Sequence, residues 1–152
     1  MSLGKNARII IVDDDENIRK TMKTILEDEG YAVDLAATGN EAIEMTQKTA
    51  YNIALLDIRL PDMEGVELLK LIKDNVPRTR KIMVTGYPSM QNAISALNKN
   101  ADAYLVKPVD VEKLLNMVKE QLQLQEDEKS FSEQKVAEFI ETRVKELPVD
   151  HD

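Results

Sequence analysis

Residues 8–17 read RIIIVDDDEN, four aliphatic residues followed directly by four acidic ones. A continuous apolar run of this kind is typical of a strand that is covered on both faces, as in a parallel sheet. Two unit charges about 4 Å apart repel each other by roughly 4 kcal/mol at an effective dielectric near 20. Folding by itself would not gather such acids at one strand end, so the cluster indicates a site for a positively charged ligand.

Short apolar runs recur along the chain and alternate with segments of helical spacing. The runs cover residues 8–12, 32–36, 53–56, 82–85 and 103–106. Residues 53–56 are continuously apolar like the first run. Val33 and Leu35 instead alternate with polar or small residues, which predicts a strand nearer to an edge of the sheet.

Apolar residues between these runs recur at helical spacing. Gly30 is placed to end a first helix, Thr38–Gly–Asn–Glu41 has the pattern of a capping box that opens a second, and Asp110 can cap a fifth. The helices are expected around residues 18–26, 38–45, 66–72, 90–97 and 110–122. Five strand–helix repeats with short connections predict an α/β fold, a doubly wound five-stranded parallel sheet with helices on both faces (flavodoxin-like).

The composition excludes several classes of protein. With 152 residues, 43% hydrophobic and 32% charged, the chain is expected to be one globular domain with an appendage. The sequence has no cysteine, which excludes disulfides and cysteine-ligated zinc. No apolar run approaches the ~20 residues that cross a bilayer. We therefore expect a cytoplasmic protein without a membrane segment.

Negative charge is concentrated toward the end of the chain. The formal net charge is −8, and residues 110–152 contain twelve acidic and six basic residues. Binding to nucleic acid requires a basic face, so we expect none by this chain alone.

Residues 125–152 form a second pattern of their own. Residues 125–130 are polar, Ser130–Phe–Ser–Glu133 resembles a capping box, and Pro148 stops the pattern. Apolar spacing returns at Val136, Phe139, Ile140, Val144 and Leu147. Such a stripe packs back on the same domain, pairs with a second chain or belongs to a linker toward an output domain, and self-association is our preferred reading. We divide the chain into residues 1–6 (disordered or left from expression), a domain of 7–124, and a C-terminal helical extension or linker of 125–152.

Polar residues stand at the carboxyl ends of four of the predicted strands. Asp13 and Asp14, Asp57, Thr85 and Lys107 each end or follow one run. In open parallel sheets ligands bind outside the carboxyl ends of the strands. The fold is therefore expected to gather these side chains on one rim.

Asp13, Asp14 and Asp57 would form a pocket of hard oxygen ligands. Such a pocket suits Mg²⁺, with Mn²⁺ as a second candidate. An alternative is that Asp14 or Asp15 merely caps the first helix, where acids are favoured by the helix dipole. We assign that role to Asp15 and Glu16 but not to the pair Asp13 and Asp14, because one cap does not require two preceding acids.

Asp57 ends a buried run before a loop that contains Pro61 and Gly65, and it is either a nucleophile or a structural turn acid. Thr85–Gly86 offers a hydroxyl and space for a bulky anion, and Lys107 offers an ammonium group. Each signal is weak alone. Together they provide carboxylates for a metal, an acid to attack, and two groups to hold phosphoryl oxygens.

Four segments carry a resemblance to a known family: IIIVDDDEN, LLDIRLPDMEG, VTGYPS and AYLVKP. In these segments, and in their order, the sequence resembles the receiver domain of two-component response regulators, the chemotaxis-regulator-like fold, over roughly residues 7–124. The resemblance implies a phosphoacceptor regulator rather than an enzyme. Such a domain takes a phosphoryl group from a phosphohistidine on a sensor histidine kinase or a phosphotransfer protein, and later loses it to water.

The resemblance also implies a role for each acidic residue of the rim. Asp57 would be the phosphoacceptor and would contact the metal. Asp14 would be the more direct metal ligand of the acidic pair, and Asp13 would often act through water. The backbone carbonyl of Arg59 would be the remaining protein ligand.

The remaining implied roles concern the switch. Thr85, beside Gly86, would be the switch hydroxyl, Tyr104 the switch aromatic and Lys107 the phosphate-binding lysine. The bond from Lys107 to Pro108 would be cis, which costs a proline only ~0.5–1 kcal/mol. The output surface would comprise the fourth helix, fifth strand and fifth helix, around residues 89–119. That surface or the C-terminal helix would carry a homodimer.

Two rival interpretations fit part of the pattern. A phosphohydrolase of the haloacid dehalogenase type also uses Asp, Thr, Lys and Mg²⁺, but its nucleophile stands on the first strand in Asp-x-Asp followed by Thr or Val. Here Asp13–Asp–Asp15 is followed by Glu16–Asn17, and no substrate-capping insertion is visible. A pseudo-receiver would be an interaction module whose tail is the functional part, and the intact set of rim residues argues against it.

Overall fold

The computed structural model describes residues 6–72, 77–86 and 101–146. The expected fourth helix at 90–97, and with it part of the expected output surface, lies outside the described residues. The N-terminal residues 1–5 and the end of the C-terminal pattern at Leu147 and Pro148 lie outside them as well.

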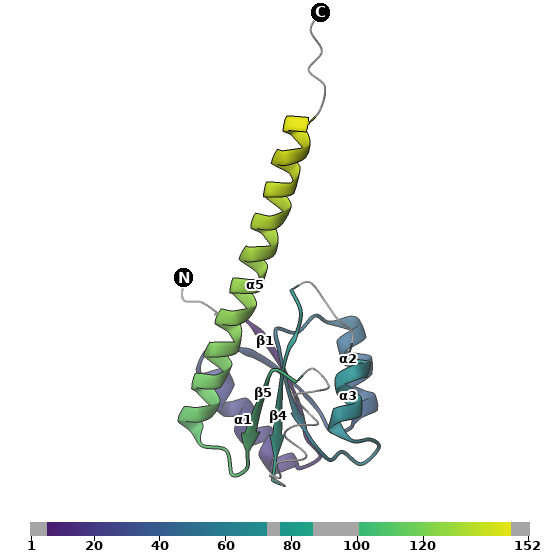
Figure 1. The fold of residues 1–152 in the computed structure, drawn as a ribbon. Coiled ribbons are helices and arrows are strands. Elements are labelled where there is room, and N and C mark those ends of the chain that lie inside the picture. Colours follow the sequence, from purple (N-terminus) through teal and green to yellow (C-terminus); the bar gives the residue numbers. More distant parts are fainter. Residues whose placement is uncertain (1–5, 73–76, 87–100, 147–152) are drawn as a thin grey trace, which may run out of the picture.

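Five strands of the described residues build one sheet. They are β1 (Arg8–Val12), β2 (Ala32–Ala36), β3 (Ile53–Asp57), β4 (Arg80–Thr85) and β5 (Ala103–Val106). All neighbours pair in parallel, in the order β2-β1-β3-β4-β5 (Figure 1). The edge position predicted for β2 is confirmed, and β3, near the middle, is buried along its whole length.

Helices cover both faces of this sheet. Those described are α1 (Glu16–Asp28), α2 (Gly39–Lys48), α3 (Gly65–Leu71) and α5 (Val111–Glu146). Alternate residues of β1 face opposite layers: Ile9 and Ile11 pack in the core with α1 and α5, whereas Ile10 and Val12 pack in the core with α2 and α3 (Figure 1). This arrangement confirms the doubly wound α/β fold, because both faces of the sheet are buried under helices.

The predicted helix ends are largely those of the structure. Asp15 is the N-cap of α1 and accepts hydrogen bonds from two backbone N–H groups of the first turn. Gly30 follows that helix with a φ of 96°, a conformation that glycine adopts without strain. The Thr38 hydroxyl caps α2 by accepting a hydrogen bond from the N–H of Glu41. The Glu41 carboxylate accepts from the N–H of Ala37 and not from that of Thr38, so only one of the two hydrogen bonds of a capping box is formed.

The last helix differs from the expectation. The capping pattern at Ser130 predicted a new helix start, and this is wrong: α5 runs without interruption from Val111 to Glu146. Residues 109–147 contain neither glycine nor proline and are rich in Glu, Gln, Lys and Leu, all good helix formers. The polar stretch at 125–130 therefore lies within the helix and does not interrupt it. Within the described residues, no helix is both long and apolar enough to cross a membrane.

Candidate functional site

The carboxyl ends of the strands bring the predicted residues to one edge of the sheet. Asp57 ends β3 and Thr85 ends β4, while Asp13 directly follows β1 and Lys107 directly follows β5. The register supports this convergence: Val12 pairs with Leu56, Asp57 with Val84, and Thr85 with Val106.

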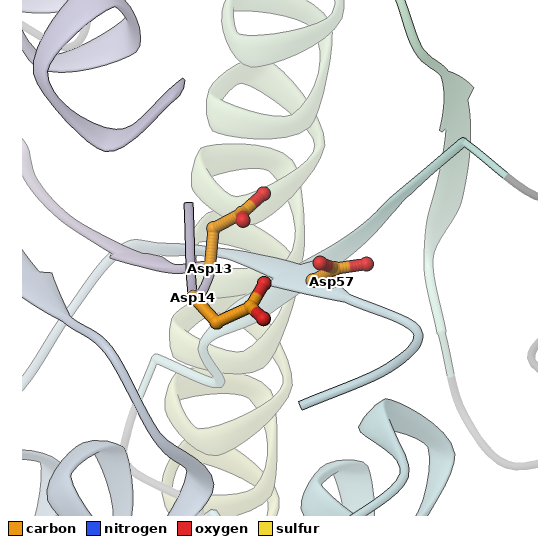
Figure 2. A group of neighbouring side chains, drawn as sticks. All are labelled: Asp13, Asp14 and Asp57. Atoms are coloured by element: carbon orange, nitrogen blue, oxygen red, sulfur yellow. The ribbon is translucent and has the colours of Figure 1, made fainter. Parts of the chain in front are cut away.

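Three carboxylates meet at this edge. One oxygen from each of Asp13, Asp14 and Asp57 lies within 4.8 Å of the other two. Figure 2 shows the three side chains next to one another, two from the end of β1 and one from β3. Asp13 and Asp57 are buried, with exposed fractions of 1% and 7%. Asp14 is exposed and gives the cluster an opening to solvent.

Lys107 joins two of these acids. Its ammonium nitrogen lies 2.6 Å from Oδ2 of Asp13 and 3.4 Å from Oδ2 of Asp57. Burial by itself would lower the pKa of Lys107, but the hydrogen bond and charge of Asp13, together with the charge of Asp57, outweigh burial and raise it. The lysine therefore stays cationic at neutral pH.

Within the cluster, the environment of Asp57 disfavours the ionised form of its carboxyl group. Burial raises its pKa above the ordinary value, and the negative charge of Asp13 raises it further. Lys107 and the backbone N–H of Arg59, which donates to Oδ1 of Asp57 at 3.3 Å, act in the opposite direction without cancelling the rise. One lysine does not balance three acids, so the pocket favours an additional cation.

The donor set fits a hard divalent cation. A pocket of about 400 Å³ opens at the cluster. It is lined by Asp13, Asp14, Asp15, Ile18, Asp57, Arg59, Gly86 and Lys107. Three carboxylates in a pocket with room for water suit Mg²⁺, which keeps several waters when bound to protein. Asp15 borders this pocket, but its side chain caps α1, as predicted.

The expected switch residues lie around the same edge. Thr85 is fully buried, and its backbone carbonyl accepts a hydrogen bond from the N–H of Lys107 at 2.7 Å. Gly86 lines the pocket, but a methyl group there would make only ordinary contacts with Lys107, so close packing does not require the glycine. The Lys107–Pro108 peptide bond is cis, the isomer that the resemblance implies.

Tyr104 is the second residue of β5, two positions before Val106 at the carboxyl end of the strand. Its ring is half-buried, and its hydroxyl is buried without a hydrogen-bond partner among the residues that the structure describes. Burial raises the pKa of this hydroxyl, which therefore stays protonated at neutral pH.

Two residues that support the site were not assigned a role from the sequence. A Cβ atom on Gly65, the first residue of α3, would collide with the backbone carbonyl oxygen of Asp57, so only glycine lets this helix approach the acid. Asp62, in the loop after β3, accepts hydrogen bonds from the N–H groups of Gly39 and Asn40 at 2.8 Å each. It thereby ties the loop to the start of α2. The Asp62 contacts have no local sequence signal, because they join residues 22 and 23 positions apart in the chain. The approach of Gly65 to Asp57, eight positions before it, depends on how the loop between them folds.

Comparison with known proteins identifies the family. The model of the response regulator receiver domain matches residues 9–119, which is most of the chain and includes every rim residue. This chain belongs to the response regulator receiver family. A receiver domain protein from Methanospirillum hungatei, described as CheY-like, has a similar structure with a TM-score of 0.76 and 50% sequence identity, covering 80% of this chain and 98% of that one.

Longer relatives contain the receiver domain as one part. The regulatory protein AtoC of Escherichia coli is 35% identical over 118 residues, which are 78% of this chain and 26% of that protein. The response regulator ArlR of Staphylococcus saprophyticus is 33% identical over 118 residues, 78% of this chain and 53% of that protein. This receiver thus spans between about a quarter and about half of these two curated relatives.

Proposed function

We propose that this receiver domain accepts a phosphoryl group on Asp57 from a phosphohistidine of a sensor histidine kinase or a phosphotransfer protein. The supporting observation is the contact of Lys107 with both Asp13 and Asp57, beside the exposed Asp14. A buried carboxylate with a lysine at one side and an opening to solvent at the other is accessible to a phosphorylated partner. The proposed role is that of a regulator that assists its own phosphorylation and dephosphorylation, and not that of an enzyme.

The transfer requires little covalent chemistry from the protein. A carboxylate oxygen of Asp57 bonds to phosphorus while the phosphorus–nitrogen bond of the donor breaks, and the imidazole leaves with the electron pair. Lys107 holds a phosphoryl oxygen and offsets part of its charge. Asp13, Asp14, Asp57 and the backbone carbonyl of Arg59 would hold Mg²⁺, which would supply further stabilisation of the charge on the phosphoryl oxygens. Water later attacks phosphorus, and Asp57 leaves as a free carboxylate.

Phosphorylation would then change the surface near β5. It adds about −1.5 to −2 charges and strong hydrogen-bond acceptors at Asp57. The hydroxyl of Thr85 turns toward them, and the ring of Tyr104 fills the vacated space. The buried hydroxyl of Tyr104 has no hydrogen-bond partner among the described residues, which supports this proposal because its present position costs free energy that a movement of the ring can relieve. To move the ratio of active to inactive conformation from 1:99 to 99:1, interactions must favour the active conformation by about 5.5 kcal/mol. We therefore expect a bound partner to supply part of this free energy.

We also propose that the domain reaches from residue 7 to residue 124, acts in the cytoplasm, and uses residues around 89–119 as its output surface. It binds no nucleic acid by itself. Residues 125–152 act as an extension from the receiver domain, and a homodimer forms through the output surface or through this extension.

Labelling with a small phosphodonor tests the proposal. Wild-type protein, incubated with acetyl phosphate and Mg²⁺, should gain one phosphoryl group on Asp57. Asp57→Asn should lose the label and keep the fold, whereas Asp28→Asn, a change of an exposed acid on α1, should keep the label. Labelling that persists in Asp57→Asn would contradict the assignment.

The same experiment separates the two rivals. A haloacid dehalogenase-type hydrolase would carry the label on Asp13, and a pseudo-receiver would carry none. No observation in the structure favours either over the phosphoacceptor.

A further inference from the structure

The loop between β3 and α3 is folded into a short hairpin. The N–H of Leu60 donates to the backbone carbonyl of Met63 at 3.1 Å. Closer to the sheet, the N–H of Gly65 donates to the carbonyl of Ile58 at 2.6 Å. We call residues 58–65 the hairpin loop. Its backbone therefore follows a defined course from the end of β3 to the start of α3.

This pairing fixes the direction in which the backbone groups of Arg59 point. Arg59 lies opposite Glu64 in an antiparallel bridge, and the two hydrogen bonds of the hairpin loop flank this pair. In such a pair the two residues do not bond directly to each other, so the N–H and C=O groups of Arg59 both face away from Glu64. The N–H donates to Oδ1 of Asp57 at 3.3 Å. The C=O of Arg59 therefore lies on the side of the Asp57 carboxylate, where we have proposed that it holds the metal.

Asp62 holds the tip of the hairpin loop against another element. Its Oδ1 accepts a hydrogen bond from the N–H of Gly39, and its Oδ2 accepts one from the N–H of Asn40, each at 2.8 Å. The loop lies close to α2 here, since a Cβ atom on Gly39 would collide with the side chain of Met63. Thr38 already caps this helix through its own side chain. The helix therefore does not require Asp62 for its start, and the main effect of the contact is to hold the loop.

The contact joins the two sides of the acidic site. The helix α2 follows β2, the hairpin loop follows β3, and β1 lies between these two strands in the sheet. Asp13 and Asp14 follow β1, and the N–H of Asp13 donates to the carbonyl of Ala36 at the end of β2. The helices α2 and α3 pack in one core layer on the same face of the sheet (Figure 1). Asp62 thus connects the loop that contains Arg59 to the side of the fold that holds Asp13.

We propose that Asp62 is a positioning residue for the metal: by tying the hairpin loop to α2, it holds the carbonyl of Arg59 beside the carboxylate of Asp57, so that both can bind one divalent cation. This inference rests on the proposed function, which assigns the Arg59 carbonyl to the metal. Asp62 itself belongs neither to the cluster of three carboxylates nor to the lining of the pocket. Without the tie, the loop loses more conformational freedom when the cation binds, and the affinity falls.

Calorimetric titration of the full chain with Mg²⁺ alone tests this proposal. Asp62→Ala should raise the dissociation constant of Mg²⁺ by about tenfold, as expected when a group that holds a metal ligand in place is removed. Asp62→Asn keeps one carbonyl oxygen for an N–H group of α2 and should raise the constant by only about threefold. The two variants lose the same charge, so the difference between them reports on the hydrogen bonds.

Two control variants exclude other causes. Glu64→Gln removes a negative charge from the same loop, at an exposed residue whose side chain makes no capping hydrogen bond. It should change the dissociation constant by less than about twofold, because exposed charges are screened by salt. Thr38→Ala removes the other cap of α2. It should lower the stability against urea, as Asp62→Ala does, but leave Mg²⁺ binding unchanged.

Labelling of Asp57 by acetyl phosphate gives a second readout. In Asp62→Ala the Mg²⁺ concentration that gives half-maximal labelling should rise by the same factor of about ten. The maximal rate at saturating Mg²⁺ should stay that of wild type, because Asp57 and Lys107 are unchanged. A purely structural defect would lower the maximal rate instead.

Three outcomes would overturn the proposal. They are Mg²⁺ binding in Asp62→Ala that equals that of wild type, an equal loss of affinity in Asp62→Asn and Asp62→Ala, and an equal loss in Thr38→Ala. If wild type itself takes up no Mg²⁺, the metal site of the proposed function fails together with this inference. Normal binding by both wild type and Asp62→Ala would overturn this inference alone and leave the proposed function standing.

Discussion

The ammonium nitrogen of Lys107 lies 2.6 Å from a carboxylate oxygen of Asp13, although the two residues are 94 positions apart in the chain. They stand at the ends of β5 and β1, and two other strands lie between those strands in the sheet. The contact therefore connects two strands that are not neighbours in the sheet, and the long side chain of Lys107 is what allows it. It places one positive charge above the carboxylate of Asp57 on the intervening strand β3.

Replacing Lys107 with Gln should separate metal binding from phosphoryl transfer. The ammonium group competes with a cation for Asp13 and Asp57, so its removal should strengthen Mg²⁺ binding by about tenfold, or about 1.4 kcal/mol. Labelling by acetyl phosphate should fall by at least about 100-fold, because a group that stabilises the phosphoryl oxygens is lost. Calorimetric titration and a labelling time course measure the two effects. Lys70→Gln, a change of an exposed lysine on α3, should alter neither, and weaker Mg²⁺ binding in Lys107→Gln would contradict this view.

Replacing Asp57 with Asn should stabilise the metal-free fold. The pKa of Asp57 is raised by burial and by Asp13, so its charged form costs stability in the folded state. The wild type should gain stability as the pH falls through that raised pKa, and the advantage of the variant should shrink in parallel. At pH 7 we expect Asp57→Asn to raise the free energy of unfolding by about 1 kcal/mol.

Urea denaturation in the presence of a chelator measures this difference. The control is Asp62→Asn, whose carboxylate has a lowered pKa because of the N–H groups of Asn40 and Gly39. That variant should gain no stability. If Asp57→Asn is less stable than the wild type without metal, the ionised Asp57 carboxylate does not destabilise the folded state, and the argument fails.

Replacing Gly65 with Ala should damage both the fold and the site. The added methyl group collides with the backbone carbonyl of Asp57, and α3 must shift. Overpacking of this kind costs about 1–3 kcal/mol, and we expect slower labelling as Asp57 is displaced. Gly30→Ala is the matched control: its φ of 96° disfavours alanine, but its surroundings are empty. It should cost about 1 kcal/mol and leave the labelling rate unchanged, so equal labelling in both variants would refute the argument.

Replacing Asp102 with Asn should weaken the fold in a pH-dependent way. Burial alone would raise the pKa of Asp102, but hydrogen bonds from Arg78 and the N–H of Lys81, and the charges of Arg78 and Arg80, outweigh it and lower the pKa below 3.8. The ionised carboxylate therefore contributes stability above pH 3.8, and this contribution is lost as the pH falls through the lowered pKa.

At pH 7 we expect Asp102→Asn to lose about 2 kcal/mol of unfolding free energy, because both arms of the Arg78 fork pair with this carboxylate. The deficit, measured by denaturation at several pH values, should narrow below pH 3.8. Asp28→Asn, an exposed change on α1, should stay within about 0.5 kcal/mol of wild type throughout. A deficit that is constant with pH would show that the loss has another cause.

The sheet and the rim were predictable from the sequence because their signals are local. Each central strand is a continuous apolar run, and in a parallel sheet the residues at the run ends share one edge. The start of β4 was missed: Arg80 and Lys81 do not look like strand residues. Arg80 is nevertheless buried there, because Gln121, Glu128 and Asp102 satisfy its guanidinium from other elements.

Two more features were missed because they depend on tertiary contacts, whereas the error at Ser130 has a different cause. The close approach of Gly65 to Asp57 and the cap that Asp62 provides for α2 depend on contacts across the fold. At Ser130 a local signal was present and misleading. A capping box begins a helix only where the chain is not already helical, and the preceding residues carry the helix through.

A titration of Mg²⁺ with and without beryllofluoride, a phosphoryl mimic, tests most directly whether the rim holds a cation beside a reactive oxygen of Asp57. We predict one Mg²⁺ per chain, binding of beryllofluoride only when Mg²⁺ is present, and a mutual gain in affinity that is equal for both ligands. Asp57→Asn should lose the beryllofluoride response. Failure to take up Mg²⁺, or beryllofluoride binding that is the same without the metal or without Asp57, would contradict the account.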